Sequence, residues 1–336
     1  MRPSDRMIGN SPSLHAALEH LSRLAPIDRP VLVMGERGTG KELAAERLHF
    51  LSGRWDAPLV KVNCAAMAES LLESELFGHE AGAFTGATRM HRGHFEQADG
   101  GTLFLDELGT MSTRLQEKLL RLIEYGEFQR VGGHKTLQVD VRVIAATNAD
   151  LRQLASEGEF RDDLLDRLSF DVVHMPPLRH RPGDIEELAE HFAMQMCAEL
   201  GRELFPGFSQ RALYALLQHT WPGNVRELKN VVERSVFRWP SPESAVDEIV
   251  IDPFQSPYPD ADAANSVGQH IPPEADPPAT VTDPGNFHDR MRALEITMLE
   301  DALARHGHNQ RRTAEALGLT YNQMRGLVRK YALTAP

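Results

Sequence analysis

The chain has 336 residues, of which 41% are hydrophobic and 25% charged, and its formal net charge is −12 at pH 7. Its length allows two or three domains, and its composition is ordinary for a soluble globular protein. No apolar run approaches the roughly 20 residues that a membrane-spanning helix needs, so we expect no membrane insertion. The first ten residues hold no apolar segment typical of a signal peptide, and Cys64 and Cys197 are the only cysteines. We therefore expect a cytoplasmic protein without a disulfide framework.

Charge and proline are unevenly distributed along the chain. Residues 240–287 contain nine acidic residues, no Lys or Arg, and ten of the 21 prolines. Such a segment cannot bury a hydrophobic core, so we predict an acidic, largely disordered linker there. Residues 288–336 hold eight Lys or Arg against five Asp or Glu. We therefore expect a large body, an acidic tether and a small basic domain.

The body alternates strand-like and helix-like segments. Five apolar runs, typical of buried strands, occupy residues 30–35, 58–64, 102–107, 141–148 and 170–175. Helical patterns lie between them. This alternation predicts an α/β subdomain over residues 1–175, with a mostly parallel sheet covered by helices on both faces. Residues 176–239 have a helical pattern throughout and predict a small all-α subdomain that closes over a ligand site as a lid.

The first strand leads into GERGTGKE at residues 35–42, which matches a phosphate-binding loop except at its last position. Glycines at this spacing let backbone N–H groups turn towards phosphates, and the loop lysine reaches the β and γ oxygens. The N-terminal end of the following helix adds positive potential. Glu42 stands where Ser or Thr usually holds Mg²⁺, so Asp106 and water would hold the metal. A glycine-rich helix cap is the alternative. The expected ATP contacts here are Gly35, Glu36, Arg37, Gly38, Thr39, Gly40, Lys41 and Glu42.

Residues 78–87, GHEAGAFTGA, place an aromatic ring in a segment too glycine-rich for a regular helix or strand. We predict a mobile hairpin with Phe84 as an exposed apolar anchor for a partner and Thr85 as a hydrogen-bonding group. The flanking glycines would let its tip swing when the nucleotide site changes state. The alternative is a loop whose Phe84 folds back onto its own domain. The predicted partner contacts are Gly82, Ala83, Phe84, Thr85, Gly86 and Ala87.

The third strand, TLFLDE at residues 102–107, ends in two carboxylates. The carboxyl ends of parallel strands meet at one edge of the sheet, so Asp106 and Glu107 should lie beside the phosphate-binding loop. Asp106 can hold Mg²⁺, and Glu107 can polarise an attacking water. By itself such a pair is more often simply solvated. Together with the loop it predicts a site that hydrolyses ATP with Mg²⁺.

The C-terminal domain has helical spacing, then a short helix at 310–317, a turn containing glycine, and a last helix from residue 321. Thr320 and Gln323 form a capping box that starts this last helix. The pattern predicts a helix-turn-helix that binds double-stranded DNA, with a solvated dimerisation bundle as the alternative. The early residues would reach base edges and the other basic ones phosphates. The expected DNA contacts are Thr320, Asn322, Gln323 and Arg325, together with Arg311, Arg312, Arg329 and Lys330.

Taken together, these motifs resemble the AAA+ domain of bacterial enhancer-binding proteins, the activators of sigma-54 RNA polymerase. The resemblance spans about residues 7–239 and rests on GERGTGKE, ELFGHEAGAFTGA, GGTLFLDE, FRDDLLDRL and WPGNVREL. The GAFTGA element is close to diagnostic, and the tail is similar to a Fis-type helix-turn-helix. With no receiver or sensor segment ahead of the ATPase, and with GERGTGKE, NCAA and the QEKLLRLIEYGE stretch together, the chain most resembles the members that control phage-shock operons.

The resemblance implies an α/β AAA+ P-loop ATPase that assembles as a homo-hexamer and binds upstream activating DNA. It would use ATP to remodel the sigma-54 RNA polymerase holoenzyme into an open complex. A separate inhibitory protein, the phage-shock negative regulator, would bind the ATPase domain. Three other functions fit part of the sequence. The first is an activator of a different sigma-54 regulon, and the second is a nucleotide-switched DNA-binding repressor or scaffold without turnover. The third is a protein-unfolding ring, against which the DNA-binding tail argues.

The resemblance also assigns roles to single residues. Asn63 matches the residue that hydrogen-bonds the catalytic Glu107 and switches its pose. Arg161 and Arg167 match arginines that reach into the neighbouring subunit's site, although ion pairs to the aspartates around them are the alternative. The remaining expected ATP contacts are Ile8 and Gly9 on the adenine side, the sensor residues Thr147 and Asn148, and a second sensor, Arg226, on the lid.

Two further features invite a functional interpretation. The histidine-rich stretches 91–94 and 305–309 lack a second ligand cluster or a cysteine pair, so we predict no metal site in them. Trp55 lies in a polar loop, where it is either part of a partner surface or packed against its own domain.

Overall fold

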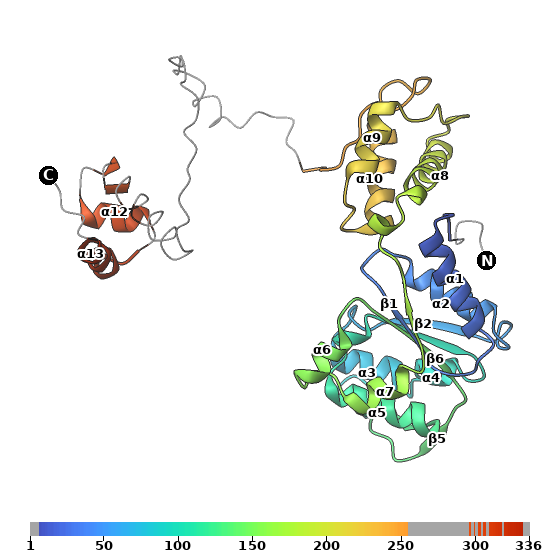
Figure 1. Ribbon diagram of the computed structural model, residues 1–336. Coiled ribbons are helices and arrows are strands. Elements are labelled where there is room, and N and C mark those ends of the chain that lie inside the picture. The colour runs from blue at the N-terminus through green and yellow to red at the C-terminus, as the bar shows by residue number, and fades with distance from the viewer. Residues whose placement is uncertain are drawn as a thin grey trace. The chain divides into compact units, whose positions relative to one another are not determined.

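The computed structural model in Figure 1 describes residues 7–254, 296, 299, 302, 303, 305, 306, 309–317 and 319–331. The chain divides into two compact units, Met1–Gln255 and Ser256–Pro336, and each is considered by itself. The predicted linker from residue 255 onward lies outside the described residues.

The first unit is built on a five-stranded sheet in which every pairing is parallel. All five predicted strands are confirmed. Strand β1 lies between β6 and β7, and β6 separates it from β3. In spatial order the strands are β2 (Leu59–Asn63), β3 (Thr102–Asp106), β6 (Arg142–Thr147), β1 (Val31–Met34) and β7 (Val172–His174).

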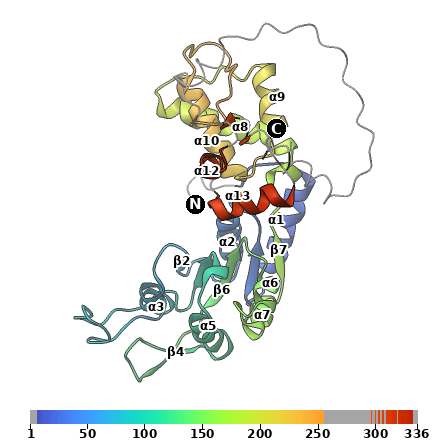
Figure 2. The same cartoon turned by 90° about the vertical axis from the view of Figure 1, so that its left-hand side faces the viewer.

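Helices cover both faces of this sheet, as predicted (Figure 1, Figure 2). Successive strand residues point to opposite faces, so each strand contributes to two cores. On one face Val33 and Phe104 pack with α1 (Pro12–Leu24) and α2 (Lys41–Phe50). On the other face, Leu103 and Leu105 pack with helices that follow later in the chain: α3 (Glu69–Phe77), α5 (Thr113–Tyr125), α6 (Leu151–Ser156) and α7 (Asp162–Leu168).

Local signals set the helix ends. The hydroxyl of Ser11 accepts from the N–H of Leu14 at 3.4 Å and caps α1, whose first residue is Pro12. Ser112 caps α5 in the same way. The shorter elements of this subdomain are α4 (His94–Gln97), η2 (Leu108–Thr110) and the antiparallel hairpin of β4 (Glu127–Gln129) and β5 (Thr136–Gln138). The short η3 (Leu178–His180) follows β7, and its Leu178 belongs to the lid core.

The lid is all-α, as predicted, and contains α8 (Gly183–Glu199), α9 (Gln210–Gln218) and α10 (Asn224–Arg238). Its helices enclose a separate hydrophobic core around Trp221, which is fully buried. The indole Nε1 of Trp221 donates to the carbonyl of Leu216 at 2.9 Å, so the ring is oriented as well as buried.

The segment 241–251 packs against the lid, although it was predicted to begin the extended linker. Val246 is 1% exposed and belongs to the lid core, and Ile249 and Ile251 pack against the same core. Val246 also exchanges backbone hydrogen bonds with Gly207 and Ser209, both at 2.9 Å. The structure differs from the prediction here because three spaced aliphatic side chains find an apolar surface. Composition averaged over a long acidic segment hides them.

In the second unit, α12 (Gln310–Ala316) and α13 (Tyr321–Lys330) follow each other across a short turn. Ala314, Met324 and Val328 are buried together with two residues of the preceding helical segment, Leu299 and Leu303. The predicted capping box is confirmed, because Thr320 accepts from the N–H of Gln323 and the Gln323 side chain accepts from the N–H of Thr320. None of the described helices combines the length and the apolar character that a bilayer crossing requires.

Val246→Ala should destabilise the first unit by about 2 kcal/mol, because it removes two buried methyl groups and leaves a cavity in the lid core. Urea unfolding followed by circular dichroism measures this free energy. Glu248→Ala, which changes an exposed neighbour, serves as the control and should leave the free energy of unfolding within about 0.5 kcal/mol. Equal behaviour of the two variants would place residues 241–251 in the linker after all.

Candidate functional site

The glycine-rich loop 35–40 connects β1 to α2 at the carboxyl edge of the sheet. The N–H of Gly35 donates to the carbonyl of Thr147 at the end of β6, at 3.2 Å, which fixes the start of the loop. Gly38 has φ of +78°, and an added Cβ there would lie 2.2 Å from the carbonyl oxygen of Gly223 on the lid. Only glycine allows both this backbone conformation and this close approach. Helix α2 begins directly after the loop and directs its N-terminal end at the same space.

Lys41 is held inside this loop. Its side chain is buried, and Nζ donates to the carbonyls of Gly35 at 2.9 Å and Glu36 at 3.3 Å. Burial lowers the pKa of Lys41, and the negative charges of Glu107 and Asp106 oppose that effect. The ammonium is therefore already in place for a phosphate, beside two carboxylates.

The acidic pair lies where the strand order predicts. In the register of β2 and β3, Asn63 is paired with Asp106. The carboxylate of Asp106 accepts from the N–H of Glu107 at 2.9 Å, and Glu107 has φ of +53°. Arg37 Nε lies 3.7 Å from the Glu107 carboxylate. The side chain of Asn63 instead accepts from the N–H of Ala65 at 2.9 Å, so the described residues show no hydrogen bond between Asn63 and Glu107.

Glu42, at the position that departs from the usual loop, forms an ion pair with Lys61 on β2 at 2.9 Å. Glu46, one turn further along α2, pairs with the same ammonium. The Glu42 carboxylate is therefore already engaged by a cation. Thr39, which also carries a hydroxyl in this loop, donates it to the carbonyl of Glu36 at 2.9 Å.

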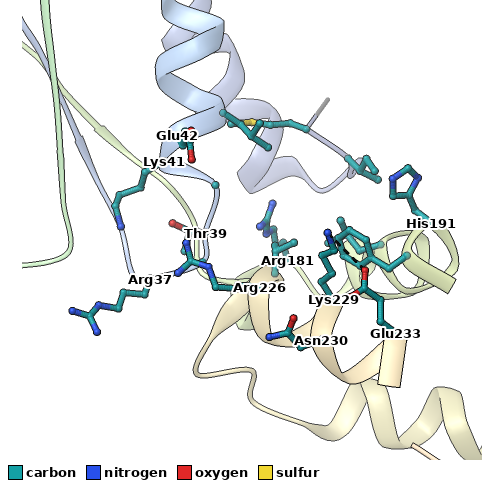
Figure 3. Close-up of a pocket in the computed structure, with 18 of the residues that line it drawn as sticks. Arg37, Thr39, Lys41, Glu42, Arg181, His191, Arg226, Lys229, Asn230 and Glu233 are labelled. Carbon is teal, nitrogen blue, oxygen red and sulfur yellow. Dashed lines mark ion pairs between the residues drawn. The ribbon is translucent and has the colours of Figure 1, made fainter. Parts of the chain in front are cut away.

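A pocket of about 600 Å³ lies between this loop and the lid (Figure 3). Predicted residues line it, namely Ile8, Arg37, Gly38, Thr39, Gly40, Lys41, Glu42, Asp106, Glu107 and Arg226. Lid residues that the sequence analysis missed also line it, namely Arg181, Leu188, His191, Phe192, Lys229, Asn230 and Glu233. Helical spacing could have found most of them. Residues 188, 191 and 192 share one face of α8, and 226, 229, 230 and 233 share one face of α10.

Glu36 joins the loop to the lid. Its carboxylate accepts two N–H groups of Arg179, at 2.6 and 2.8 Å, and one from the side chain of Asn224 at 3.1 Å. Hydrogen bonds from Arg179 and then Asn224 lower the pKa of Glu36 to about 2. Asn224 is fully buried at the start of α10, and its side chain also donates to the carbonyl of Arg37 and accepts from the N–H of Leu178. The neighbouring N–H of Val225 donates to the carbonyl of Gly38 at 3.0 Å.

A buried carboxylate holds the N-terminal segment against the lid. Asp184, at the start of α8, accepts from the N–H groups of Asn10 and Ser11 and from the hydroxyl of Ser11, at 2.7 to 2.8 Å. An ideal Cβ on Gly9 would lie 2.5 Å from this carboxyl group. Ile8, just before it, lines the pocket. The predicted adenine-side pair, Ile8 and Gly9, therefore lies at the junction of pocket and lid.

Several predicted residues, among them Thr147, Asn148 and Arg161, do not line the pocket. Thr147 is fully buried, and its hydroxyl accepts from the N–H of Ala149 at 3.0 Å. Asn148 beside it is exposed. Arg161 pairs with Asp163 at 2.7 Å, so one of the ion pairs considered as an alternative is present.

Arg167 likewise does not line the pocket. It pairs with Glu124 on α5 at 2.7 Å. The ion pairs of Arg161 and Arg167 are partly exposed and therefore weak. Either arginine can exchange its carboxylate for a partner that binds it more strongly.

The GAFTGA loop, residues 82–87, is a closed turn on an anchored base. Gly82 and Gly86 have φ of +85° and +103° with open space around them, and the N–H of Gly82 donates to the carbonyl of Ala87 at 2.7 Å. Phe84 is 47% exposed, and its ring packs edge-on against His79 with 4.9 Å between centroids. The Phe84 ring is thus half-exposed, as the prediction of a partner anchor requires. It is also partly folded back onto its own domain, which was the alternative for this loop.

The base of this loop is tied to the segment beside the β4–β5 hairpin. The N–H of Glu80 donates to the carbonyl of Val131 at 3.1 Å. Arg130 pairs with Glu80 at 2.8 Å and with Glu96 at 2.6 Å. The loop and the hairpin therefore lie side by side at the same end of the subdomain (Figure 2).

The predicted DNA-contacting residues lie on α12, α13 and the turn between them. Arg311, Arg312, Arg325 and Arg329 are exposed. Gln323 is exposed but engaged in the capping box, so its amide oxygen is occupied at the helix start. Thr320 and Lys330 are also exposed, and Lys330 Nζ lies 4.5 Å from the centroid of the Tyr331 ring. The side chain of Asn322 lies outside the described residues.

Comparison with known proteins divides the chain in the same way. It matches the sigma-54 interaction domain over residues 7–174, the AAA+ ATPase lid domain over residues 179–252, and the Fis family of bacterial regulatory proteins over residues 290–331. The match to the lid domain includes the packed segment 241–251.

Individual relatives show the same similarity. The chain is 54% identical over 329 residues to the Psp operon transcriptional activator of Escherichia coli (strain K12), which covers 98% of both chains. It is 43% identical over 319 residues to the Nif-specific regulatory protein of Azotobacter vinelandii, covering 95% of this chain and 57% of the relative. Among solved structures, NtrX from Brucella abortus in complex with ATP has a TM-score of 0.67 and 31% identity, covering 97% of this chain and 69% of NtrX.

Glu36→Gln should flatten the acid dependence of stability. The folded pKa of Glu36 is about 2, below its ordinary 4.5, so the interaction contributes fully above about pH 4.5 and is lost as the pH falls towards 2. Because the pair is partly exposed, we expect a difference of less than about 1 kcal/mol. Urea unfolding at about pH 5 and about pH 3 measures the loss, which should be smaller in the variant than in the wild type. Glu19→Gln, an exposed change on α1, should match the wild type. If the free energy of unfolding fell as much in Glu36→Gln as in the wild type between the two pH values, the Glu36 carboxylate would not hold the lid in solution.

Proposed function

Since this chain belongs to the family of sigma-54-dependent transcription activators, and is therefore an ATPase with a Fis-type DNA-binding domain, we propose that it works as a cytoplasmic homo-hexamer. In this proposal the C-terminal domain binds upstream activating DNA. The GAFTGA loops of the ring contact the sigma-54 RNA polymerase holoenzyme, and ATP turnover drives them to remodel it into an open complex. The likeness to the Psp operon activator supports phage-shock promoters as targets and a separate inhibitory protein as a partner.

One observation carries this proposal: the GAFTGA loop is inserted between β2 and β3, the two strands whose ends hold Asn63 and the acidic pair. The chain leaves the carboxyl end of β2 through α3 and reaches the loop, so a shift at Asn63 is transmitted along the chain to the segment that bears it. The loop base is in turn fixed to the body through Arg130 and backbone hydrogen bonds. Asn63, the GAFTGA loop and the acidic pair thus lie on one continuous stretch of chain.

The pocket residues suit hydrolysis of a nucleoside triphosphate. We assign the β and γ phosphates to the loop N–H groups and Lys41, and the proton of the attacking water to Glu107. As that water bonds to the γ phosphorus, the bond to the ADP oxygen breaks. Arg226, which lines the pocket from the lid, stabilises the charge on the phosphoryl oxygens.

The donor set fits a magnesium ion. The carboxylate of Asp106 lines the pocket, and hard oxygen ligands from one carboxylate, water and phosphates are those that Mg²⁺ prefers. When bound, the ion would neutralise developing charge on the phosphates. Glu42 pairs with Lys61, so Asp106 is the residue that we assign to the metal.

Arg161 and Arg167 explain why activity would require assembly. Both lie away from the pocket of their own chain, on and beside α7, and both hold carboxylates in exposed pairs. We propose that in a head-to-tail ring they exchange these partners for the phosphates in the neighbouring subunit. Asn63 would then switch from the Ala65 N–H to Glu107 in one step of the cycle, and Thr147 with Asn148 would sense the γ phosphate.

Glu107→Gln should retain ATP binding and lose at least about a hundredfold in the rate of phosphate release, because it removes the general base. Phosphate release and promoter opening would be followed on the same preparation, with Glu19→Gln as control. If promoter opening requires ATP hydrolysis, Glu107→Gln should no longer open promoters. If Glu107→Gln opened promoters normally, the protein would be a nucleotide-operated switch.

Thr85→Ala should separate turnover from output. Thr85 is exposed at the loop tip and lies outside the pocket, so phosphate release should stay within about twofold of the wild type. ATP-dependent open-complex formation with sigma-54 holoenzyme should be lost. Thr88→Ala, an exposed threonine just outside the element, is the matched control and should open promoters. Promoter opening by Thr85→Ala at the wild-type level would rule out the loop as the coupling contact.

A further inference from the structure

Arg181 differs from the other described cations around the pocket. Lys41 donates to two carbonyls, Arg37 lies near Glu107, and Lys229 pairs with Glu233 at 3.7 Å. Arg226 is exposed to solvent. The Arg181 side chain is 3% exposed, its Nε is buried without a hydrogen-bond partner, and it makes no ion pair with any described residue.

An unpaired buried guanidinium is unfavourable in the free protein. Arginine carries only donors and stays protonated, so it cannot escape by losing its charge. Burial lowers the pKa of Arg181, which shows the same desolvation, and the charge of Asp184 opposes it. Asp184 is already occupied by Asn10 and Ser11. A group that enters the pocket, which Arg181 lines, can supply an acceptor to this guanidinium.

The surroundings of Arg181 indicate which part of a nucleotide it meets. It lies between the loop residues Arg37 and Lys41 on one side and His191 on the other (Figure 3). Only Pro182 separates it from α8, whose apolar residues Leu188 and Phe192 line the pocket. The negative charge of Asp184 acts on Arg181, and Asp184 is also the residue against which Gly9, next to Ile8, packs. On this side of the pocket Leu188 and Phe192 offer an apolar surface on which a base can pack.

We propose that Arg181 binds the purine base of the nucleotide, donating to an acceptor nitrogen of the ring. This role rests on the ATP site proposed above and adds a specificity residue to it. It explains why a buried cation without a partner is present at all, since its hydrogen bond is completed only when the base is in place. The nucleotide thereby also stabilises the junction between the lid and the N-terminal segment.

The proposal gives Arg181→Met an unusual combination of effects. Removing an unpaired buried charge should leave the Tm of the nucleotide-free protein unchanged or higher. ATP affinity should fall by about tenfold to a hundredfold, because a charged hydrogen bond to the base is lost. The Tm increase caused by ADP should shrink accordingly. Arg238→Met, an exposed change at the end of α10, is the control and should behave as the wild type.

Analogues locate the contact. Affinities of the full chain would be measured by calorimetry for ATP, for 1-, 3- and 7-deaza-ATP, each lacking one ring nitrogen, and for tripolyphosphate. We expect one deaza analogue to bind the wild type at least about tenfold more weakly than ATP, and Arg181→Met to bind that analogue and ATP equally. Tripolyphosphate should bind both proteins equally.

Three results would overturn the proposal. An equal loss of tripolyphosphate affinity would make Arg181 a phosphate residue. Failure of the wild type to discriminate any deaza analogue would remove the ring contact, and a lower Tm of nucleotide-free Arg181→Met would indicate a structural role. Wild-type protein that bound no ATP at all would instead contradict the ATP site itself, so the two failures are distinguishable.

Discussion

The site depends on the parallel pairing of β1 with β6 and of β6 with β3. Because all three strands run in the same direction, their carboxyl ends meet at one edge, and each end carries a different part of the chemistry. Met34, before the phosphate-binding loop, is paired with Thr147, and the N–H of Gly35 donates to the Thr147 carbonyl. The acidic pair follows β3 at the same edge. A slip of one residue in any of these pairings would turn each side chain to the opposite face.

The lid is attached to this edge by polar groups that are almost fully buried. Asn224 and Asp184 are both buried, and each is satisfied by hydrogen bonds to segments far away in the chain. A buried polar group that loses its partner costs about 1–3 kcal/mol, so these contacts favour one position of the lid strongly. The position they favour is the one that forms the pocket between α8, α10 and the glycine-rich loop.

The GAFTGA loop has the opposite character. Its tip has open space around both glycines and a half-exposed aromatic ring, whereas its base is held by backbone hydrogen bonds and the Arg130 ion pairs. Because the tip has few contacts with the rest of the domain, it is free to move. Because the base has many contacts with the domain, it moves together with the domain. This division is consistent with the role that we propose for the loop, as an element driven from the nucleotide site that contacts a partner.

The sequence by itself determined the five strands of the main sheet and the motifs from which an ATP site was predicted. Apolar runs located all five strands, glycine spacing located the phosphate loop, and TLFLDE located the acidic pair, because these signals are local. The resemblance to a known family supplied the roles that no local pattern carries, such as those of Arg161 and Arg167.

Only the tertiary structure decided which distant residues share the pocket and which charges are paired. Arg181 lies in an ordinary arginine-rich stretch, and nothing in its neighbours along the chain shows that it is buried without a partner. Residues 241–251 likewise have a linker's composition, yet Val246 is buried because the lid core has room for it. Burial and pairing depend on segments that are remote in sequence, and that is why they could not be predicted.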